Sequence, residues 1–356
     1  MKLIYSNSIY TEEYKKIEKS SIPVEHKKSF PFAVFRGNLY NFNLNSSLND
    51  DYELYCRYIY NKRLVNLQLN TLFLSKEIEL QYSSNHVREQ FEKELTKINK
   101  VLIINSFHYS SYKSILPCFL INNCDVFLLA TPKVILENEH KTNLFSTICN
   151  NLFSTDSSAC FINAEDYLSL IKLYEILSKK EFRRKPVLLI FPDGNIGADR
   201  KNDTNKNLFK VNFHGTKIHI RQGIFSFAKT LLAPVFNVLT ESHKDFISMK
   251  IHNYYDFTNK NIHPDEFTSM LFQNFEKFLC RKNIPKWECM MYLHSWMDTK
   301  AFNKDIFVTE KTFDKERYTS FKIDNQQYIF DSKYLLSLEV DSDNIKKCVL
   351  KNKFYE

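Results

Sequence analysis

Residues 101–107 read VLIINSF, a short apolar run that is typical of a strand buried on both faces of a sheet. Two runs of the same kind follow, DVFLLAT at 125–131 and VLLIF at 187–191. Segments with a helical pattern lie between them, at 112–122, 141–153 and 164–179, and Asn163 is a candidate N-cap for the last. This alternation predicts an α/β fold, in which helices flank a twisted and mainly parallel sheet.

The pattern continues on both sides of these segments. We expect further helices at 85–99, 223–232, 263–282 and 285–298, and further strands at 159–162, 234–238 and 247–254. Residues 1–50 show no periodicity apart from the apolar patch 30–35, which predicts an irregular N-terminal arm. The alternating runs 318–324 and 327–330 flank Asn325 and predict a C-terminal β-hairpin extension. The expected parts are therefore an N-terminal extension (1–84), an α/β domain (85–300) and a β-rich appendage (301–356).

The composition excludes several classes of protein. Of the 356 residues, 44% are hydrophobic and 25% charged, as in ordinary globular proteins. The eight cysteines form no CxxC pair and no zinc spacing, so we expect reduced thiols, no metal and a cytoplasmic location. The N-terminus lacks the apolar region of a signal peptide, and no run of about 20 apolar residues occurs, which predicts a soluble or at most peripheral protein. No phosphate loop and no GxGxxG motif is present, so no bound cofactor is expected. The absence of a GxSxG motif argues against a serine hydrolase.

The net charge of +8 is concentrated in one segment. Residues 183–221 contain nine Lys or Arg and three Asp, a net charge of +6. A basic surface suits an acidic carrier protein, a phosphorylated cofactor, an anionic membrane or nucleic acid. A solvated basic loop without a partner explains the same charge.

The overlapping segment 193–223 holds four of the five glycines of the chain, Gly194, Gly197, Gly215 and Gly223. We expect glycine where φ is positive or two backbones approach closely. Because ligands of α/β sheets bind beyond the carboxyl ends of strands, this segment predicts a ligand cleft, with tight turns as the structural alternative.

A histidine is expected at the same edge of the sheet. His108 directly follows the strand 101–107, where it can act as a general base or simply end the strand with a polar group. Two further histidines of the glycine-bearing segment, His214 and His219, are candidates to line the same cleft.

Four blocks of sequence carry a family resemblance. They are His108 after its strand, Phe191-Pro192-Asp193-Gly194, Phe213-His214-Gly215 with Gly223 and Ala233-Pro234-Val235, and Ile284-Pro285-Lys286-Trp287 with His294 and Trp296. In this order and spacing they resemble the bacterial lipid A (lauroyl/myristoyl) acyltransferase-like family of the lysophospholipid acyltransferase superfamily. The chain departs from the family's HxxxxD/E motif, because Lys113 stands at the acidic position. It also has Leu232 and Asn237 where the family has a glycine and a proline.

The resemblance implies acyl transfer from a thioester donor, acyl carrier protein or coenzyme A, to a hydroxyl or amine. The acceptor would be soluble or tethered to a carrier, in secondary-metabolite or lipid biosynthesis. His108 would be the catalytic base, and backbone N–H groups or Arg221 would stabilise the oxyanion. The other substrate-binding candidates are Asp193, Gly194, Arg200, Gly215 and Gly223, and the basic segment would receive the carrier protein or the cofactor phosphates. Peripheral membrane contact is compatible with this function.

Lys113 leaves the partner of His108 open. Another carboxylate can replace the missing acid, and topology makes Asp193 and Asp125 the candidates. Alternatively, His108 acts unaided, or the chain binds acyl carriers or lipids without catalysis. Hydrolysis of a thioester in the same cleft is a further alternative. Nucleic-acid binding through the basic segment remains a rival function, although we do not expect a nucleic acid as partner.

Overall fold

The run at 101–107 forms β3 (Leu102–Ser106), and all five of its residues are buried. In the computed structural model β3 lies inside an eight-stranded sheet, parallel to β6 (Lys185–Ile190) on one side and to β9 (Val235–Ser242) on the other. The structure describes residues 3–4, 8–20, 22–71, 79–179, 181–194, 208–243, 246–257, 262–293, 296–297, 313–324 and 326–340.

The strand order is β1-β10-β9-β3-β6-β4-β5, and β2 also pairs with β10. β1 and β9 run antiparallel to β10, and all other pairs of this sheet are parallel. The α/β class and the mainly parallel sheet are therefore confirmed. The strands not yet bounded are β1 (Leu3–Ile4), β2 (Glu79–Tyr82), β4 (Cys124–Ala130), β5 (Ser158–Asn163) and β10 (Phe246–Tyr255).

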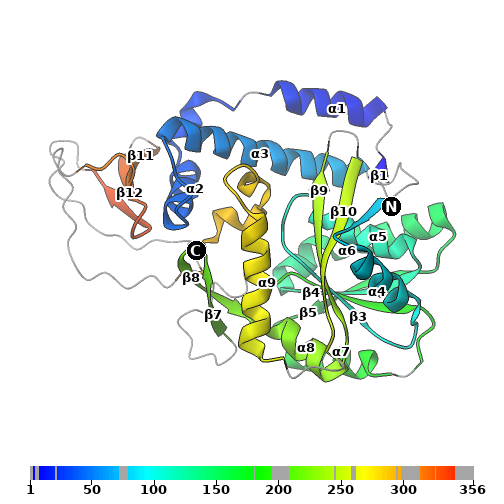
Figure 1. Ribbon diagram of the computed structural model, residues 1–356. Helices are drawn as coiled ribbons and strands as arrows, with labels where there is room; N and C mark the ends of the chain where they lie inside the picture. The colour runs from blue at the N-terminus through cyan, green and yellow to red at the C-terminus, as the bar shows by residue number, and fades with distance from the viewer. Residues whose placement is uncertain are drawn as a thin grey trace. The chain divides into compact units, whose positions relative to one another are not determined.

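Helices cover this sheet, and most of them match the expected segments. α5 packs against α6 and α7 packs against α8 (Figure 1). The cap of α7 differs from the prediction: Asp166 accepts hydrogen bonds from the backbone N–H groups of Leu168 and Ser169, whereas Asn163 accepts one from Glu165 in the turn after β5. The bounds are α4 (Asn85–Thr96), α5 (Ile115–Ile121, after the 3-10 turn η3 at Tyr112–Ser114), α6 (Pro132–Phe153), α7 (Tyr167–Leu177) and α8 (Gly223–Leu231).

The irregular N-terminal arm was a wrong prediction, because this part of the chain is mostly helical. α2 shows no amphipathic period because every residue from Phe32 to Leu39 is buried, and a helix buried all round has no polar stripe. Ser29 caps it by accepting from the N–H of Phe32. The elements here are α1 (Ser8–Lys19), η1 (Val24–Lys28), α2 (Phe30–Asn41) and α3 (Leu48–Thr71).

The C-terminal hairpin is confirmed and gains a third strand. β11 (Tyr318–Ile323) and β12 (Gln326–Asp331) pair antiparallel, and β12 also pairs with β13 (Leu336–Glu339). α9 (Pro264–Phe278) matches its prediction. The helix expected at 285–298 is wrong, since two short 3-10 turns, η5 (Ile284–Lys286) and η6 (Glu288–Met291), occupy its first part.

The chain divides into two compact units that alternate along the sequence. The first contains residues 1–17, 62–196 and 221–271, and the second contains 18–61, 197–220 and 272–356. The parts expected from the sequence are consecutive, whereas these units are each built from three separate segments. None of the helices in the described part of the chain has the length and apolar content that crossing a membrane requires.

Candidate functional site

The register of two parallel strands brings His108 and Asp193 together. In the pairing of β3 with β6, Asn105 is the partner of Ile190, and each candidate residue lies three positions beyond its paired residue. The two strands are parallel, so the segments that follow them leave the carboxyl edge of the sheet at the same level. The contact therefore depends on a pairing between segments about 80 residues apart in sequence.

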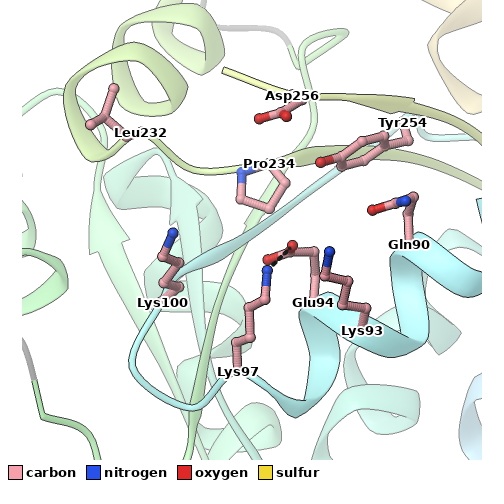
Figure 2. A pocket seen from close by; sticks show the side chains of 9 residues that line it. All are labelled: Gln90, Lys93, Glu94, Lys97, Lys100, Leu232, Pro234, Tyr254 and Asp256. Carbon is pink, nitrogen blue, oxygen red and sulfur yellow. Dashed lines mark hydrogen bonds and ion pairs between the residues drawn. The ribbon is translucent and has the colours of Figure 1, made fainter. Parts of the chain in front are cut away.

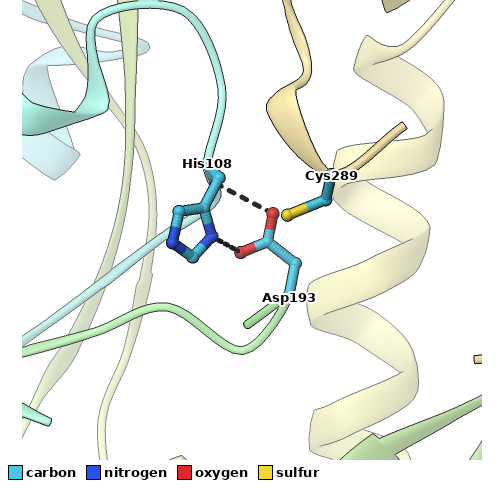
Figure 3. A group of neighbouring side chains, drawn as sticks. All are labelled: His108, Asp193 and Cys289. Carbon is cyan, nitrogen blue, oxygen red and sulfur yellow. Dashed lines mark hydrogen bonds and ion pairs between the residues drawn. The ribbon is translucent and has the colours of Figure 1, made fainter. Parts of the chain in front are cut away.

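Asp193 holds His108 at two points (Figure 3). Its Oδ1 lies 2.8 Å from Nδ1 of the imidazole, and its Oδ2 accepts the backbone N–H of His108 at 2.8 Å. The carboxylate is fully buried, whereas the imidazole is 23% exposed. Such a bidentate contact fixes both the position and the rotation of the ring. Nε2 lies on the side of the ring away from Asp193 (Figure 3).

The turn after β6 aims Asp193 at His108. The N–H of Gly194 donates to the carbonyl of Phe191 at 3.3 Å, which closes a four-residue turn with Pro192 at its second position. Proline is common at the second position of such turns because its φ is already fixed near the required value. A methyl group on Gly194 would lie 4.0 Å from Cε1 of His108, an ordinary contact. Glycine is thus not sterically required here.

Two aromatic side chains enclose the imidazole. The ring of Tyr112 meets it edge-on, with centroids 4.7 Å apart, and the ring of Phe191 lies 4.8 Å from it. Both belong to the segments that follow β3 and β6. Phe191 belongs to the block 191–194, but neither ring was predicted as a site residue, because a tyrosine and a phenylalanine in these positions look like ordinary core residues.

The loop after His108 is anchored on the other neighbour of β3. The Thr240 hydroxyl donates to the carbonyl of Tyr109 at 3.0 Å, and the N–H of Ser242 donates to the Ser110 hydroxyl at 2.8 Å. Ser110 has a φ of 52°, a left-handed conformation that these contacts support. His108 is therefore tied to β6 through Asp193 and to β9 through the residues that follow it.

Lys113, at the acidic position of the HxxxxD/E motif, does not replace the acid. It belongs to η3, and its Nζ lies 5.7 Å from the centre of the Tyr112 ring. Asp125 is also placed elsewhere, at the amino end of β4, where it accepts from Arg184 Nε at 2.9 Å and from the Ser158 hydroxyl at 2.6 Å. Of the two carboxylates that topology allowed, only Asp193 contacts His108.

The remaining predicted site residues are dispersed along the chain. Gly215 has a φ of 77° and forms, with His214 at 47°, the two-residue turn of the hairpin β7 (Leu208–Phe213) and β8 (Thr216–Arg221) in the second unit. That hairpin was not predicted. Arg221 is the last residue of β8. Gly223 begins α8, and a side chain at this position would enter open space. Neither Gly194 nor Gly223 has a positive φ. Arg200, Gly197 and His294 lie outside the described residues.

Among the described residues of the basic segment, Arg183, Arg184 and Lys185 lie away from the carboxyl edge of the sheet, which corrects this part of the inference from charge. Arg183 and Arg184 pair with Asp156 at 2.7 and 2.8 Å, at the amino edge of the sheet. Lys185 is only 4% exposed, and its Nζ donates to the carbonyls of Glu94 and Lys97 at the end of α4. The net charge of the segment counts these three residues as available to an acidic partner. Their ion pairs and burial exclude them from a docking surface at the carboxyl edge.

A pocket of about 200 Å³ lies at the amino edge of the same sheet (Figure 2). Lys93, Lys97 and Lys100 line it together with two acidic groups, and Lys97 is paired with Glu94. Tyr254 also lines it, and burial, aided by the nearby carboxylates, raises the pKa of this phenol to about 12. The pocket contains neither His108 nor Asp193, so it is separate from the histidine site.

Compared with known proteins, the chain matches no family model and no curated protein. A partly exposed imidazole with a buried carboxylate on Nδ1 is an arrangement that can accept a proton at Nε2.

Proposed function

We propose that the chain is an acyltransferase in which His108, oriented by Asp193, is the general base. The observation that carries the proposal is the two-point hydrogen bond from His108 to the buried carboxylate of Asp193. A carboxylate on Nδ1 keeps the proton on that nitrogen and leaves Nε2 as the basic atom. It also stabilises the imidazolium that forms when the base takes a proton.

The proposed reaction moves an acyl group from a thioester to a hydroxyl or amine. Nε2 of His108 takes the proton of the acceptor as its oxygen or nitrogen attacks the thioester carbonyl. The tetrahedral intermediate then expels the thiolate, which receives the same proton from the imidazolium. A carbon–oxygen or carbon–nitrogen bond replaces the carbon–sulfur bond, and no redox change occurs.

Thioester chemistry is favoured over other uses of the dyad by the sequence around it. The blocks at His108 and at 191–194, which the structure places in contact, are the first two of the four that resemble the lipid A acyltransferase-like family. In this proposal Asp193 takes the role that the acid of HxxxxD/E has in that family. Acyl carrier protein or coenzyme A is the proposed donor, the acceptor is soluble or carrier-tethered, and the proposed location is the cytoplasm.

Product analysis tests this function. The purified chain is incubated with an acyl-coenzyme A or an acylated carrier protein, with and without a mixture of hydroxyl and amine acceptors, and the products are identified by mass spectrometry. We expect thiol release that depends on an acceptor, and an ester or amide product. Free acid alone would mean that the site hydrolyses thioesters, and binding of the donor without turnover would mean a non-catalytic acyl-carrier binder. Either result contradicts the proposal.

A further inference from the structure

A charged residue takes the last place in the buried stripe of α4. The buried residues of this helix are Val87, Phe91 and Glu94, and Glu94 is only 6% exposed. Burial of a carboxylate costs free energy unless the charge is paired. Lys97 supplies the pair, since its Nζ lies 2.5 Å from Oε1 of Glu94. The helix therefore keeps an ion pair at a position where its periodicity predicts an apolar side chain.

Lys185 adds a second buried charge at the same end of α4. Its Nζ donates to the carbonyls of Glu94 and Lys97. The carboxyl end of a helix carries partial negative charge, which repels an anion. The ammonium group of Lys185 offsets this repulsion, so an anion can bind beside the end of α4.

The pocket at the amino edge of the sheet is built on one face of this helix. α4 contributes Gln90, Lys93, Glu94 and Lys97 to the lining. Their spacing of i, i+3, i+4 and i+7 places all four on the same side of the helix. Lys100 follows α4, and the side chains of the three lysines extend toward the segment at Pro234 and Tyr254 (Figure 2).

The charge of the pocket favours an anionic ligand. Its lining holds three lysines and two carboxylates, a net charge of +1. Glu94 is paired with Lys97, which leaves Lys93 and Lys100 with Asp256 as the other acid. Neither of these two lysines forms an ion pair within the described part of the chain. Their ammonium groups are therefore available to a ligand.

Two neutral groups add hydrogen-bond donors beside the lysines. Burial raises the pKa of the Tyr254 phenol to about 12, with smaller contributions from Asp256 and Glu94, so the phenol keeps its proton at neutral pH. The side-chain amide of Gln90 is the second donor. A phosphate ester offers three acceptor oxygens and a charge of about −2 at neutral pH. Ammonium and neutral donors around one space suit such a group.

The size of the pocket limits the ligand. Its volume of about 200 Å³ corresponds to on the order of six water molecules. Pockets that enclose drug-sized ligands have about 300 to 1,000 Å³. A phosphate with a short polyol chain fits this space, whereas a nucleotide or coenzyme A is too large to be enclosed.

We propose that this pocket binds a small phosphorylated molecule that also carries hydroxyl groups. Lys93 and Lys100 hold the phosphate, and Tyr254 donates to one of its oxygens. Asp256 repels the phosphate but accepts a hydroxyl of the carbon skeleton. The pocket lies at the opposite edge of the sheet from His108, and this proposal does not depend on the proposed function.

Calorimetric titration of the full chain tests the ligand class. Three probes are compared at one fixed ionic strength: ribose 5-phosphate, inorganic phosphate and ribose. We expect ribose 5-phosphate to bind, inorganic phosphate to bind more weakly, and ribose not to bind, because the phosphate supplies the charge and the hydroxyls add to it. A chain that binds neither phosphate probe at millimolar concentration overturns the proposal, as does a chain that binds inorganic phosphate more tightly than the ester.

Removal of the two lysine charges tests the site itself. Lys93 and Lys100 are exposed, so replacing them should leave the fold intact. Lys93→Gln and Lys100→Gln should each weaken the binding of ribose 5-phosphate roughly tenfold or more. Lys133→Gln is the matched control, because it removes the same charge from an exposed lysine of α6 outside the pocket. Equal affinities in all three variants would contradict the assignment.

Asp256→Ala separates the two parts of the ligand. This change removes a repulsive charge and a hydrogen-bond acceptor from the lining. Inorganic phosphate should therefore bind more tightly than to the wild type, and ribose 5-phosphate should lose its advantage over inorganic phosphate. An unchanged ratio of the two affinities would show that Asp256 does not contact the hydroxyl groups.

Discussion

Asp193 is the residue on which the site depends, because its carboxylate is the group that positions His108. Replacing it by asparagine keeps the shape but removes the negative charge, and an amide can hold the imidazole in the wrong tautomer. We expect Asp193→Asn to lower kcat by roughly 10²–10⁴-fold with little loss of stability. Asp125→Asn is the control, since Asp125 is also ion-paired but lies at the other edge of the sheet. Equal losses of kcat in the two variants would show that Asp193 has no special role.

Lys185 offers a test of electrostatics away from the site. Burial lowers the pKa of its ammonium from 10.5 to about 8, partly opposed by Glu94. Between these values the unfolded chain binds the proton and the folded chain does not, so stability rises with pH. The stability of the wild type relative to Lys185→Met should increase by about 2 to 3 kcal/mol from pH 7 to pH 10, measured by urea denaturation. A difference that is flat, or that falls with pH, would contradict the lowered pKa.

The contact of His108 with Asp193 could only partly be anticipated from the sequence. Both residues follow buried strands, which predicts that they lie at the carboxyl edge of the sheet. Asp125 begins the run 125–131, so in a parallel sheet it lies at the opposite edge from His108, whereas Asp193 follows its strand. Whether Asp193 then meets His108 depends on the register of β3 with β6. Register is a property of tertiary pairing and has no local signal at this position.

Among the elements, the turns give the clearest contrast between glycines. Gly215 has a φ of 77°, so Gly215→Ala should destabilise the β7–β8 hairpin by about 1 kcal/mol. Gly223 begins α8 without positive φ and with open space around it, so Gly223→Ala should be neutral or stabilise the chain by up to about 0.5 kcal/mol. Thermal unfolding of both variants measures the difference. A larger loss of stability for Gly223→Ala than for Gly215→Ala would mean that another constraint acts on Gly223.

The elements that the sequence predicted well are those with a strong local pattern. Buried strands such as β3 and β6, and amphipathic helices such as α4, were identified with ends within three residues of those observed. α2 was missed because its burial on all sides removes the helical period. The β7–β8 hairpin was missed because its turn is His214–Gly215, which is not one of the usual Asn-Gly or Asp-Gly signals.

At the scale of the whole molecule, the expected α/β domain 85–300 does not contain a complete second unit. Within that unit Phe42 packs edge-on against Phe213, Asn38 donates to the carbonyl of Met290, and Arg281 pairs with Asp51. A fragment of residues 85–300 loses one partner of each contact. We expect it to bind the dye ANS and to unfold without a sharp transition, whereas the full chain unfolds cooperatively. A cooperative fragment that does not bind ANS would show that these segments fold independently.

The central claim, that His108 is the base for acyl transfer, is tested most directly by the initial rate of thiol release in the presence of an acceptor. This rate is compared between the wild type, His108→Ala and the control His86→Ala, which removes an exposed histidine of α4 in the same unit. The account predicts a loss of roughly 10²-fold or more for His108→Ala and an unchanged rate for His86→Ala. Undiminished acyl transfer by a folded His108→Ala variant would contradict it.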